Sequence, residues 1–255
     1  MSFIRVDIDG QVACLELARG KANALNVELL LELEGALEQA AGEPGVRAIV
    51  LASALPRVFC AGFDAAEVFA YDRPAMLAFF TRFVRLFERL CMLPKPVVCA
   101  LEGHAFAGGA ILALAADFRL MAESATLSVN EVDLAVCLPA AMIHALAVSA
   151  SPELARSMLL GAEVVSAARA LAGGLVSQVL PASEVRAAAL QRARLLGEKP
   201  ALAFAVHKRA LDPFRGEPLP DAEIAATIDS WFGTEASERR RALQQRLAAK
   251  AKPKA

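Results

Sequence analysis

The sequence has few of the residues that make a metal site or a disulfide framework recognisable. It contains only three histidines, which lie far apart and form no H-E-x-x-H motif. Its five cysteines show no C-x-x-C spacing and their number is odd. This pattern fits reduced, buried thiols better than zinc ligands or disulfides. We therefore assign no metal to the protein.

Neither sign of charge is in excess. The chain carries 27 Lys and Arg residues against 28 Asp and Glu residues, for a net charge of -1 at pH 7. Proteins that bind nucleic acid carry clustered basic residues, so we expect a small-molecule or protein partner and no nucleic acid. The first residues, MSFIRVDIDG, lack the charged and then apolar blocks of a secretory signal, which favours a cytoplasmic location.

The chain also lacks an uninterrupted apolar run. Residues 97–116 are almost wholly apolar, but Glu102, His104 and three glycines interrupt them. A membrane helix needs about 20 consecutive apolar residues. The stretch therefore predicts a buried strand, a turn and a buried helix, and we expect no membrane association.

Strands alternate with helices along the first part of the chain. A hairpin is expected over residues 3–18 and a helix from Asn26, its N-cap. Further strands are expected at 46–53, 96–103, 118–123, 125–129 and 175–180, with helices at 73–93, 108–117, 139–149, 151–160, 166–172, 182–196, 199–210, 221–232 and 235–249. This order predicts an α/β fold with a largely parallel sheet. We divide the chain into an α/β core, residues 1–198, and a helical C-terminal region, residues 199–255.

Two glycine-containing turns follow predicted strands. They are FCAGFD at residues 59–64 and FAGGAIL at residues 106–112. The first amides of a helix lack internal partners and favour anionic groups. Two such turns that converge would form an oxyanion hole for a carbonyl that acquires negative charge. Glycine is common at helix starts, however, and spacing alone does not establish convergence.

Four motifs in this order resemble the crotonase, or enoyl-CoA hydratase/isomerase, superfamily. They are RGKANALN, VFCAGFD, residues 95–134 from KPVVCALEGH to NEVDL, and SAARALAGGLVSQVLP. The resemblance runs from the first hairpin to about Arg209. It implies a crotonase-like spiral of ββα units, with a helical C-terminal region that assembles homotrimers or dimers of trimers. It also implies an acyl-CoA thioester substrate, with coenzyme A as part of that substrate and no separate cofactor.

The resemblance implies roles for individual residues. The backbone amides of Phe63 and Gly108 would hold the thioester oxygen, which leaves their side chains free to vary. The residues expected to contact substrate and coenzyme A are Lys21, Ala22, Ala61, Asp64, Ala65, Ala66 and Ile111.

The glutamates favour one reaction of the family. Hydratases in it carry two glutamates that activate water; here the first position matches Ile111 and the second matches Glu131. An apolar side chain cannot hold water, whereas a single glutamate can move a proton from C2 to C4 of a 3-enoyl-CoA. The segment NEVDL also resembles Δ3-Δ2-enoyl-CoA isomerases, so we predict this activity. Apolar neighbours such as Val136 and Leu138 would exclude water and strengthen the base.

Two other functions stay open. One is another crotonase reaction, such as slow hydration or dienoyl-CoA isomerisation. The other is a non-catalytic acyl-CoA-binding protein, because Ala107, Ile111 and the segment AVCLPAAMIHAL depart from the family pattern. Glu131 could then be a solvated or helix-capping carboxylate. Asp64 is a second candidate acid, although capping of the helix AAEVF is the favoured role.

Several side chains have two interpretations. His104 is expected to pack, and His144 to be a core histidine or to approach the active site. Phe79, Phe80, Phe83 and Phe87 recur at helical spacing and either form core or line the acyl site. The apolar stripe Ile224, Ile228, Trp231 and Phe232 would pack within the chain or against a partner subunit.

Overall fold

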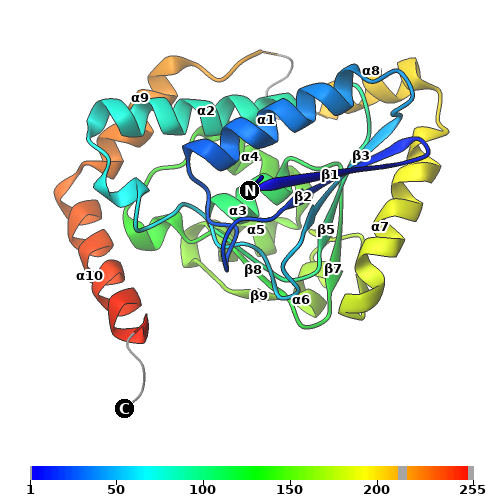
Figure 1. The fold of residues 1–255 in the computed structure, drawn as a ribbon. Coiled ribbons are helices and arrows are strands. Elements are labelled where there is room, and N and C mark those ends of the chain that lie inside the picture. The colour runs from blue at the N-terminus through cyan, green and yellow to red at the C-terminus, as the bar shows by residue number, and fades with distance from the viewer. Residues whose placement is uncertain (1, 212–216, 252–255) are drawn as a thin grey trace.

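The computed structural model describes residues 2–211 and 217–251 (Figure 1). It opens with the predicted hairpin, in which β1 (Ile4–Asp9) and β2 (Val12–Leu17) pair antiparallel. From β2 the main sheet continues in parallel through β3 (Ala48–Ser53), β5 (Val97–Leu101), β7 (Phe118–Ala122) and β10 (Gln178–Leu180). Every residue of β3 and β5 is buried, as the continuous apolar runs of central parallel strands predict.

A second, four-stranded sheet has the order β4-β6-β8-β9. Its strands are β4 (Val58–Cys60), β6 (His104–Phe106), β8 (Thr126–Ser128) and β9 (Val165–Ser166). The chain repeatedly passes from the first sheet to the second and then into a helix, as in β3-β4-α2 and β5-β6-α3. This repetition is the predicted spiral of ββα units, although the sequence did not predict β4, β6 or β9.

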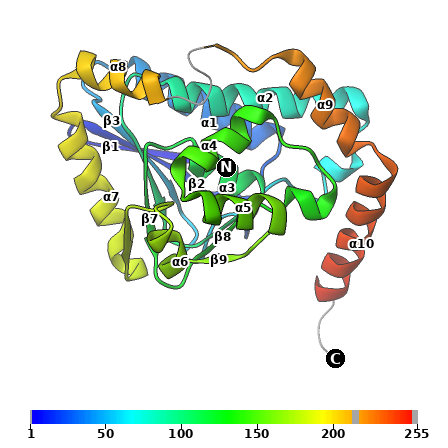
Figure 2. The ribbon, with the colours of Figure 1, turned by 180° about the vertical axis from the view of Figure 1, so that it is seen from behind.

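Long helices cover the two faces of the main sheet (Figures 1 and 2). The helices α1 (Val27–Gly42) and α2 (Arg73–Met92) pack side by side, whereas α7 (Ala182–Gly197) packs on β3, β5 and β7. The side chain of Asn26 accepts a hydrogen bond from the Leu29 amide at 3.0 Å and so caps α1 as predicted. Asp72 caps α2 in the same way through the Ala75 amide.

The remaining helices lie close to their predicted ranges. They are α3 (Gly108–Leu114), α4 (Ala140–Ser149), α5 (Pro152–Gly161), α6 (Ala167–Ala172), α8 (Ala201–Leu211), α9 (Asp221–Trp231) and α10 (Thr234–Ala251). Two short 3-10 helices also occur, η1 (Val68–Ala70) and η2 (Glu131–Leu134). Within the described part of the chain, no helix is both long and apolar enough to cross a membrane.

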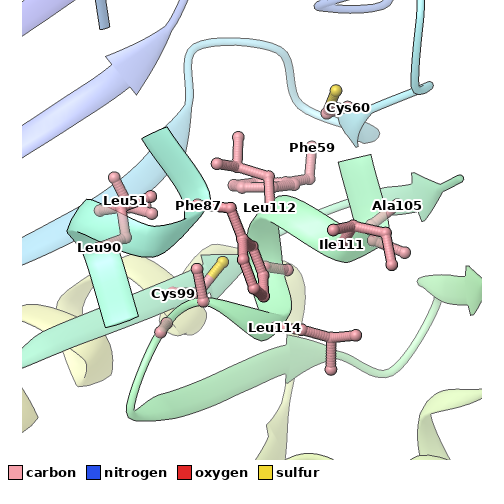
Figure 3. Packing of buried hydrophobic residues seen from close by; sticks show 14 of the residues in the cluster. Leu51, Phe59, Cys60, Phe87, Leu90, Cys99, Ala105, Ile111, Leu112 and Leu114 are labelled. Carbon is pink, nitrogen blue, oxygen red and sulfur yellow. The ribbon is translucent and has the colours of Figure 1, made fainter. Parts of the chain in front are cut away.

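The apolar side chains form one continuous core. All four phenylalanines of α2, from Phe79 to Phe87, are at most 3% exposed, so the core interpretation of these residues is confirmed. Figure 3 shows Phe87 beside the α3 side chains of Leu112 and Leu114. Ile224, Ile228 and Trp231 are also buried within this chain, and the apolar stripe of α9 therefore packs intramolecularly.

Candidate active site

The first glycine turn is held by a short parallel pairing with residues 22–25. The Leu25 amide donates to the Gly62 carbonyl at 2.8 Å, and the Asp64 amide donates to the Leu25 carbonyl at 2.9 Å. Phe63 is the residue bridged to Leu25. In this parallel bridge Leu25 makes both hydrogen bonds, one to each neighbour of Phe63, so the amide of Phe63 itself points away from Leu25. The Phe63 N–H therefore takes no part in this ladder.

The second glycine turn lies where β6 leads into α3. The Ala107 amide donates to the Ser128 carbonyl at 2.9 Å, which fixes the turn to β8. Ala107 adopts φ 48° and ψ -128°, a conformation that an L-residue other than glycine rarely takes. Gly108 is the first residue of α3, so its amide has no acceptor inside the helix.

The two turns are packed directly against each other. A Cβ placed on Gly62 would lie 3.0 Å from the Ala107 Cβ and 3.4 Å from the Gly108 nitrogen. A Cβ placed on Gly108 would lie 2.8 Å from Cε1 of the Phe63 ring. A side chain at Gly62 or Gly108 would crowd the other turn, so glycine at these positions lets the two turns pack closely. The two turns, whose relative position the spacing could not establish, are thus adjacent in the fold.

Glu131 enters the same region from β8. Phe106 pairs in register with Ser128, so the segments that carry Gly108 and Glu131 leave neighbouring parallel strands side by side. Glu131 is only 9% exposed, and among the described residues its Oε2 has no hydrogen-bond partner. This burial excludes a solvated carboxylate.

Burial also changes the acidity of Glu131. Removal from water raises the pKa of its carboxyl group to about 7, although the backbone amides of Glu131 and Asn130 lower it in part. No charged group is among the causes of this shift, and the apolar residues predicted to surround Glu131 are at least partly buried. Ile111 is 1% exposed in the first turns of α3 (Figure 3), and Val136 and Leu138 are half-buried apolar residues. A carboxyl with a pKa near neutrality can both accept and return a proton.

Asn23 organises the loop behind the first glycine turn, and it was not among the residues predicted from the sequence. It is fully buried with φ 47°, and its side-chain amide donates to Ser53 Oγ at 2.8 Å and to the Phe59 carbonyl at 2.9 Å. Its Oδ1 accepts from the Arg19 amide. A single polar residue within the apolar stretch ANAL was the only available signal.

Asp64 serves the turn and does not begin a helix. Its Oδ1 accepts a hydrogen bond from the Ala66 amide at 3.0 Å, and its Oδ2 forms an ion pair with Arg19 at 2.7 Å. The predicted helix over AAEVF is wrong, because residues 64–67 form a turn and only η1 follows. A local side-chain bond of this kind competes with helix formation. Asp64 therefore caps this turn, and its expected role of capping a helix over AAEVF is wrong.

Glu67 belongs to the same polar group and is half-buried. It accepts hydrogen bonds from the Asn26 side chain at 2.9 Å and from the Tyr71 hydroxyl at 2.5 Å. Burial, together with the hydrogen bond and charge of Glu67, raises the pKa of Tyr71.

The residues expected along coenzyme A share one edge of the molecule. The Ala61 amide donates to the Ala22 carbonyl at 3.0 Å, so residues 21–22 lie beside residues 61–66. Lys21, Ala61 and Ala66 are exposed there, whereas Ala22 and Ala65 are half-buried. An exposed lysine at this edge suits a phosphate group.

The two histidines fall elsewhere. His104 hydrogen-bonds through Nδ1 to Thr126 Oγ1 at 2.9 Å and so joins β6 to β8. His144 is exposed on α4 and lines a cavity of about 690 Å³ together with Arg119 and Lys208. The core interpretation of His144 is therefore wrong, whereas its approach to the active site stays a prediction. Glu131 and Phe63 line neither this cavity nor a second one of about 390 Å³ between residues 41–47 and 94–96.

Known proteins resemble the chain in sequence and in fold. The family described as enoyl-CoA hydratase/isomerase matches residues 7–244. The 2,3-dehydroadipyl-CoA hydratase of Escherichia coli K12 is 34% identical over 212 residues, covering 83% of this chain and 82% of the relative. An enoyl-CoA isomerase/hydratase of Zymoseptoria tritici is 30% identical over 244 residues, covering 93% and 78%. The crystal structure of human mitochondrial Δ3-Δ2-enoyl-CoA isomerase superposes with a TM-score of 0.92 at 25% identity, covering 98% of this chain and all of the human one.

Proposed function

Because the chain belongs to the enoyl-CoA hydratase/isomerase family, we propose that it moves the double bond of a 3-enoyl-CoA to the 2-position. An acyl-CoA thioester is consistent with that family. Coenzyme A would enter as part of the substrate, with no separate cofactor. Lys21, Ala22, Ala61 and Asp64 to Ala66 would lie along the coenzyme.

The observation that carries this proposal is the state of Glu131. It is a buried carboxyl, its Oε2 has no hydrogen-bond partner among the described residues, and it leaves β8 beside the first residue of α3. A structural carboxylate in such a place would be paired, because an unpaired buried charge is costly. A carboxyl with a pKa of about 7 fits a group that alternates between base and acid.

The reaction follows from these groups. The Phe63 and Gly108 amides would donate to the thioester oxygen, which makes a C2 proton more acidic. Glu131 as carboxylate would take that proton, and the electron pair would spread over a dienolate whose negative charge rests on the oxygen. The protonated Glu131 would then return the proton to C4, which leaves the double bond between C2 and C3. Removal of one such donor costs about 2.7 to 4 kcal/mol of transition-state stabilisation.

Hydration is the second candidate, since relatives such as the Escherichia coli protein are named hydratases. Ile111 argues against efficient hydration, because its buried apolar side chain stands at the position that matches the first of the two glutamates of the family's hydratases. A dienoyl-CoA isomerase or an acyl-CoA-binding protein without turnover would also fit the family.

We further propose that residues 199–255 support a homotrimer or a dimer of trimers. The apolar side chains Leu202, Val206 and Leu211 on α8 are 80%, 57% and 78% exposed. Exposed apolar groups on one helix suit a subunit contact. Sedimentation equilibrium of the full chain tests this proposal, and a monomer at micromolar concentration would contradict it.

The decisive experiment compares wild-type protein with Glu131→Gln. Wild-type protein should convert a 3-enoyl-CoA to the conjugated 2-enoyl-CoA, followed by thioester absorbance, and the variant should lose at least about 100-fold in kcat. The same incubation in heavy-oxygen water separates hydration from isomerisation. Incorporated label would favour the hydratase, and tight binding without any product would favour the non-catalytic protein.

A further inference from the structure

Ser230 and Trp231 are consecutive residues at the end of α9, and they contact opposite halves of the candidate site. Ser230 Oγ accepts a hydrogen bond from the Cys137 amide at 2.9 Å, in the segment that follows Glu131. The Trp231 ring lies 6.4 Å from the Phe63 ring, with an interplanar angle of 55°. One point on a C-terminal helix thus contacts both the glutamate segment and the oxyanion turn.

The contact of Ser230 is close to the backbone of Glu131. The Val136 amide donates to the Glu131 carbonyl at 3.1 Å, and the next amide, that of Cys137, donates to Ser230. The Ser230 hydroxyl itself donates to the Thr227 carbonyl at 2.7 Å, which orients its oxygen as an acceptor. The segment from Glu131 to Cys137 is therefore fastened at one end to β8 and at the other end to α9.

Trp231 completes the aromatic enclosure of Phe63. Phe79 and Phe83 of α2 hold the Phe63 ring edge-to-face at 4.8 and 5.2 Å, and Trp231 closes it from α9. Trp231 is 4% exposed, and the Arg240 guanidinium lies 4.3 Å above its ring. The side chain of Phe63 is thereby fixed, and its own backbone amide is fixed with it.

The position of α9 is itself set by α2. Glu88, which is buried on α2, accepts a hydrogen bond from the Leu219 amide just before α9. Near the other end of α9, Asp229 forms an ion pair with Arg73 at 2.6 Å. The α9 helix is thus held at both ends and can act as a fixed reference for the two loops.

On this basis we propose that Ser230 and Trp231 are positioning residues that set the distance between the Glu131 carboxylate and the Phe63 amide. The inference rests on the proposed function, because it gives these two groups their catalytic roles. Neither residue needs to touch the substrate. The reacting groups must be held closely, since a misplacement of about 1 Å can cost about 100-fold in rate.

Kinetics of Ser230→Ala, Trp231→Leu and the double variant test the proposal. Each single variant should lower kcat by about 10- to 100-fold with KM within about twofold of wild type. The double variant should lose less than the product of the two effects, because both residues set one distance. Trp231→Phe retains an aromatic contact with Phe63 and should restore most of kcat. Ser157→Ala removes a hydroxyl of α5 that bonds to Glu153 and Arg169, outside the candidate site, and should leave kcat unchanged.

Unchanged kcat in both single variants, or a rise in KM alone, would overturn the proposal. So would a loss of kcat that simply follows the fraction of unfolded protein measured by circular dichroism.

A binding measurement separates this inference from the proposed function. Trp231 is the only tryptophan of the chain, so its fluorescence reports on the contact with Phe63. Saturation of wild-type protein with octanoyl-CoA, an unreactive thioester, should shift or quench this emission even if 3-enoyl-CoA is not turned over. Calorimetric binding of octanoyl-CoA without any change in emission would overturn the coupling of Trp231 to the site.

Discussion

Gly62 and Ala107 face each other at the junction of the two glycine turns. A Cβ on Gly62 would come within 3.0 Å of both the Ala107 Cβ and the Phe106 carbonyl oxygen. Gly62 also has φ 93°, a conformation unfavourable for any L-residue with a side chain. The relative position of the two turns therefore depends on a residue that carries no catalytic group.

Substitution Gly62→Ala should separate the turns. We expect a loss of about 1 to 3 kcal/mol in the free energy of unfolding from backbone strain, together with a larger fall in kcat than in substrate affinity. Denaturant unfolding and steady-state kinetics measure the two effects. Gly35→Ala is the matched control, because a Cβ there meets nothing within 4 Å and Gly35 lies inside α1. It should stabilise the protein by about 1 kcal/mol, and similar behaviour of the two variants would refute the explanation.

Ala107→Gly should have the opposite effect on stability. Ala107 at φ 48° and ψ -128° stores backbone strain that glycine does not. We expect the free energy of unfolding to rise by about 1 kcal/mol, after the added entropy of glycine in the unfolded chain is subtracted. Ala187→Gly, at an exposed position inside α7, should lower it by about 1 kcal/mol. Equal destabilisation by both substitutions would show that Ala107 is unstrained.

The pH dependence should follow the ionisation of Glu131. The proposed base must be ionised to accept the C2 proton, so kcat/KM should fall as the pH is lowered through about 7. A pH–rate profile of wild-type protein measures this directly. A flat profile from pH 5 to 8 would contradict the assignment of Glu131 as base.

The free energy of unfolding should change with pH in the opposite direction to kcat/KM: it should fall as the pH rises. The pKa of Glu131 is about 7 in the folded protein against an ordinary 4.5, so the folded state binds more protons between these values. The contribution of the Glu131 carboxyl to the free energy of unfolding is fully present below pH 4.5. It declines by at most about 1.4 kcal/mol per pH unit as the pH rises to 7. Glu131→Gln should remove this decline and be more stable than wild type at pH 8. Unfolding curves at pH 5 and pH 8 give the comparison.

Asn23→Ala should destabilise the loop behind the first turn. The change removes the donor to the buried Phe59 carbonyl and places alanine at φ 47°. We expect a loss of about 2 to 4 kcal/mol in the free energy of unfolding from the unpaired group and the strain. Asn23→Gly keeps the backbone conformation and should lose less. If both variants cost the same, the backbone conformation contributes nothing at this position.

The sequence predicted the elements whose patterns are long enough to recognise. Helices α1 and α2 each extend over several turns and begin at a capping residue, Asn26 and Asp72. Strands β4 and β6 have three residues each and β9 has two, which is too short for a period to appear. The four-stranded sheet was therefore invisible in the sequence, although it is the element that places Glu131 beside Gly108.

The residues of the candidate site also fall into two groups, those that the sequence predicted and those that only the structure reveals. The two glycine turns were found from their place after predicted strands, and Glu131 was found through the resemblance of its segment to the family. Asn23, Ser230 and Trp231 act through contacts between segments far apart in the chain, such as the bond from Cys137 to Ser230. Such contacts depend on how the helices pack, and no local pattern encodes them.

Cys137 differs from the other thiols in a way that is useful in practice. Cys14, Cys60, Cys91 and Cys99 are buried, and burial raises the pKa of Cys14 to about 11 and that of Cys60 to about 12. Cys137 is exposed, in the segment between Glu131 and α4. A maleimide dye should therefore attach at this position first, without any engineered cysteine. A dye at Cys137 would therefore sit on the segment that joins Glu131 to α4 and would report any change in its surroundings.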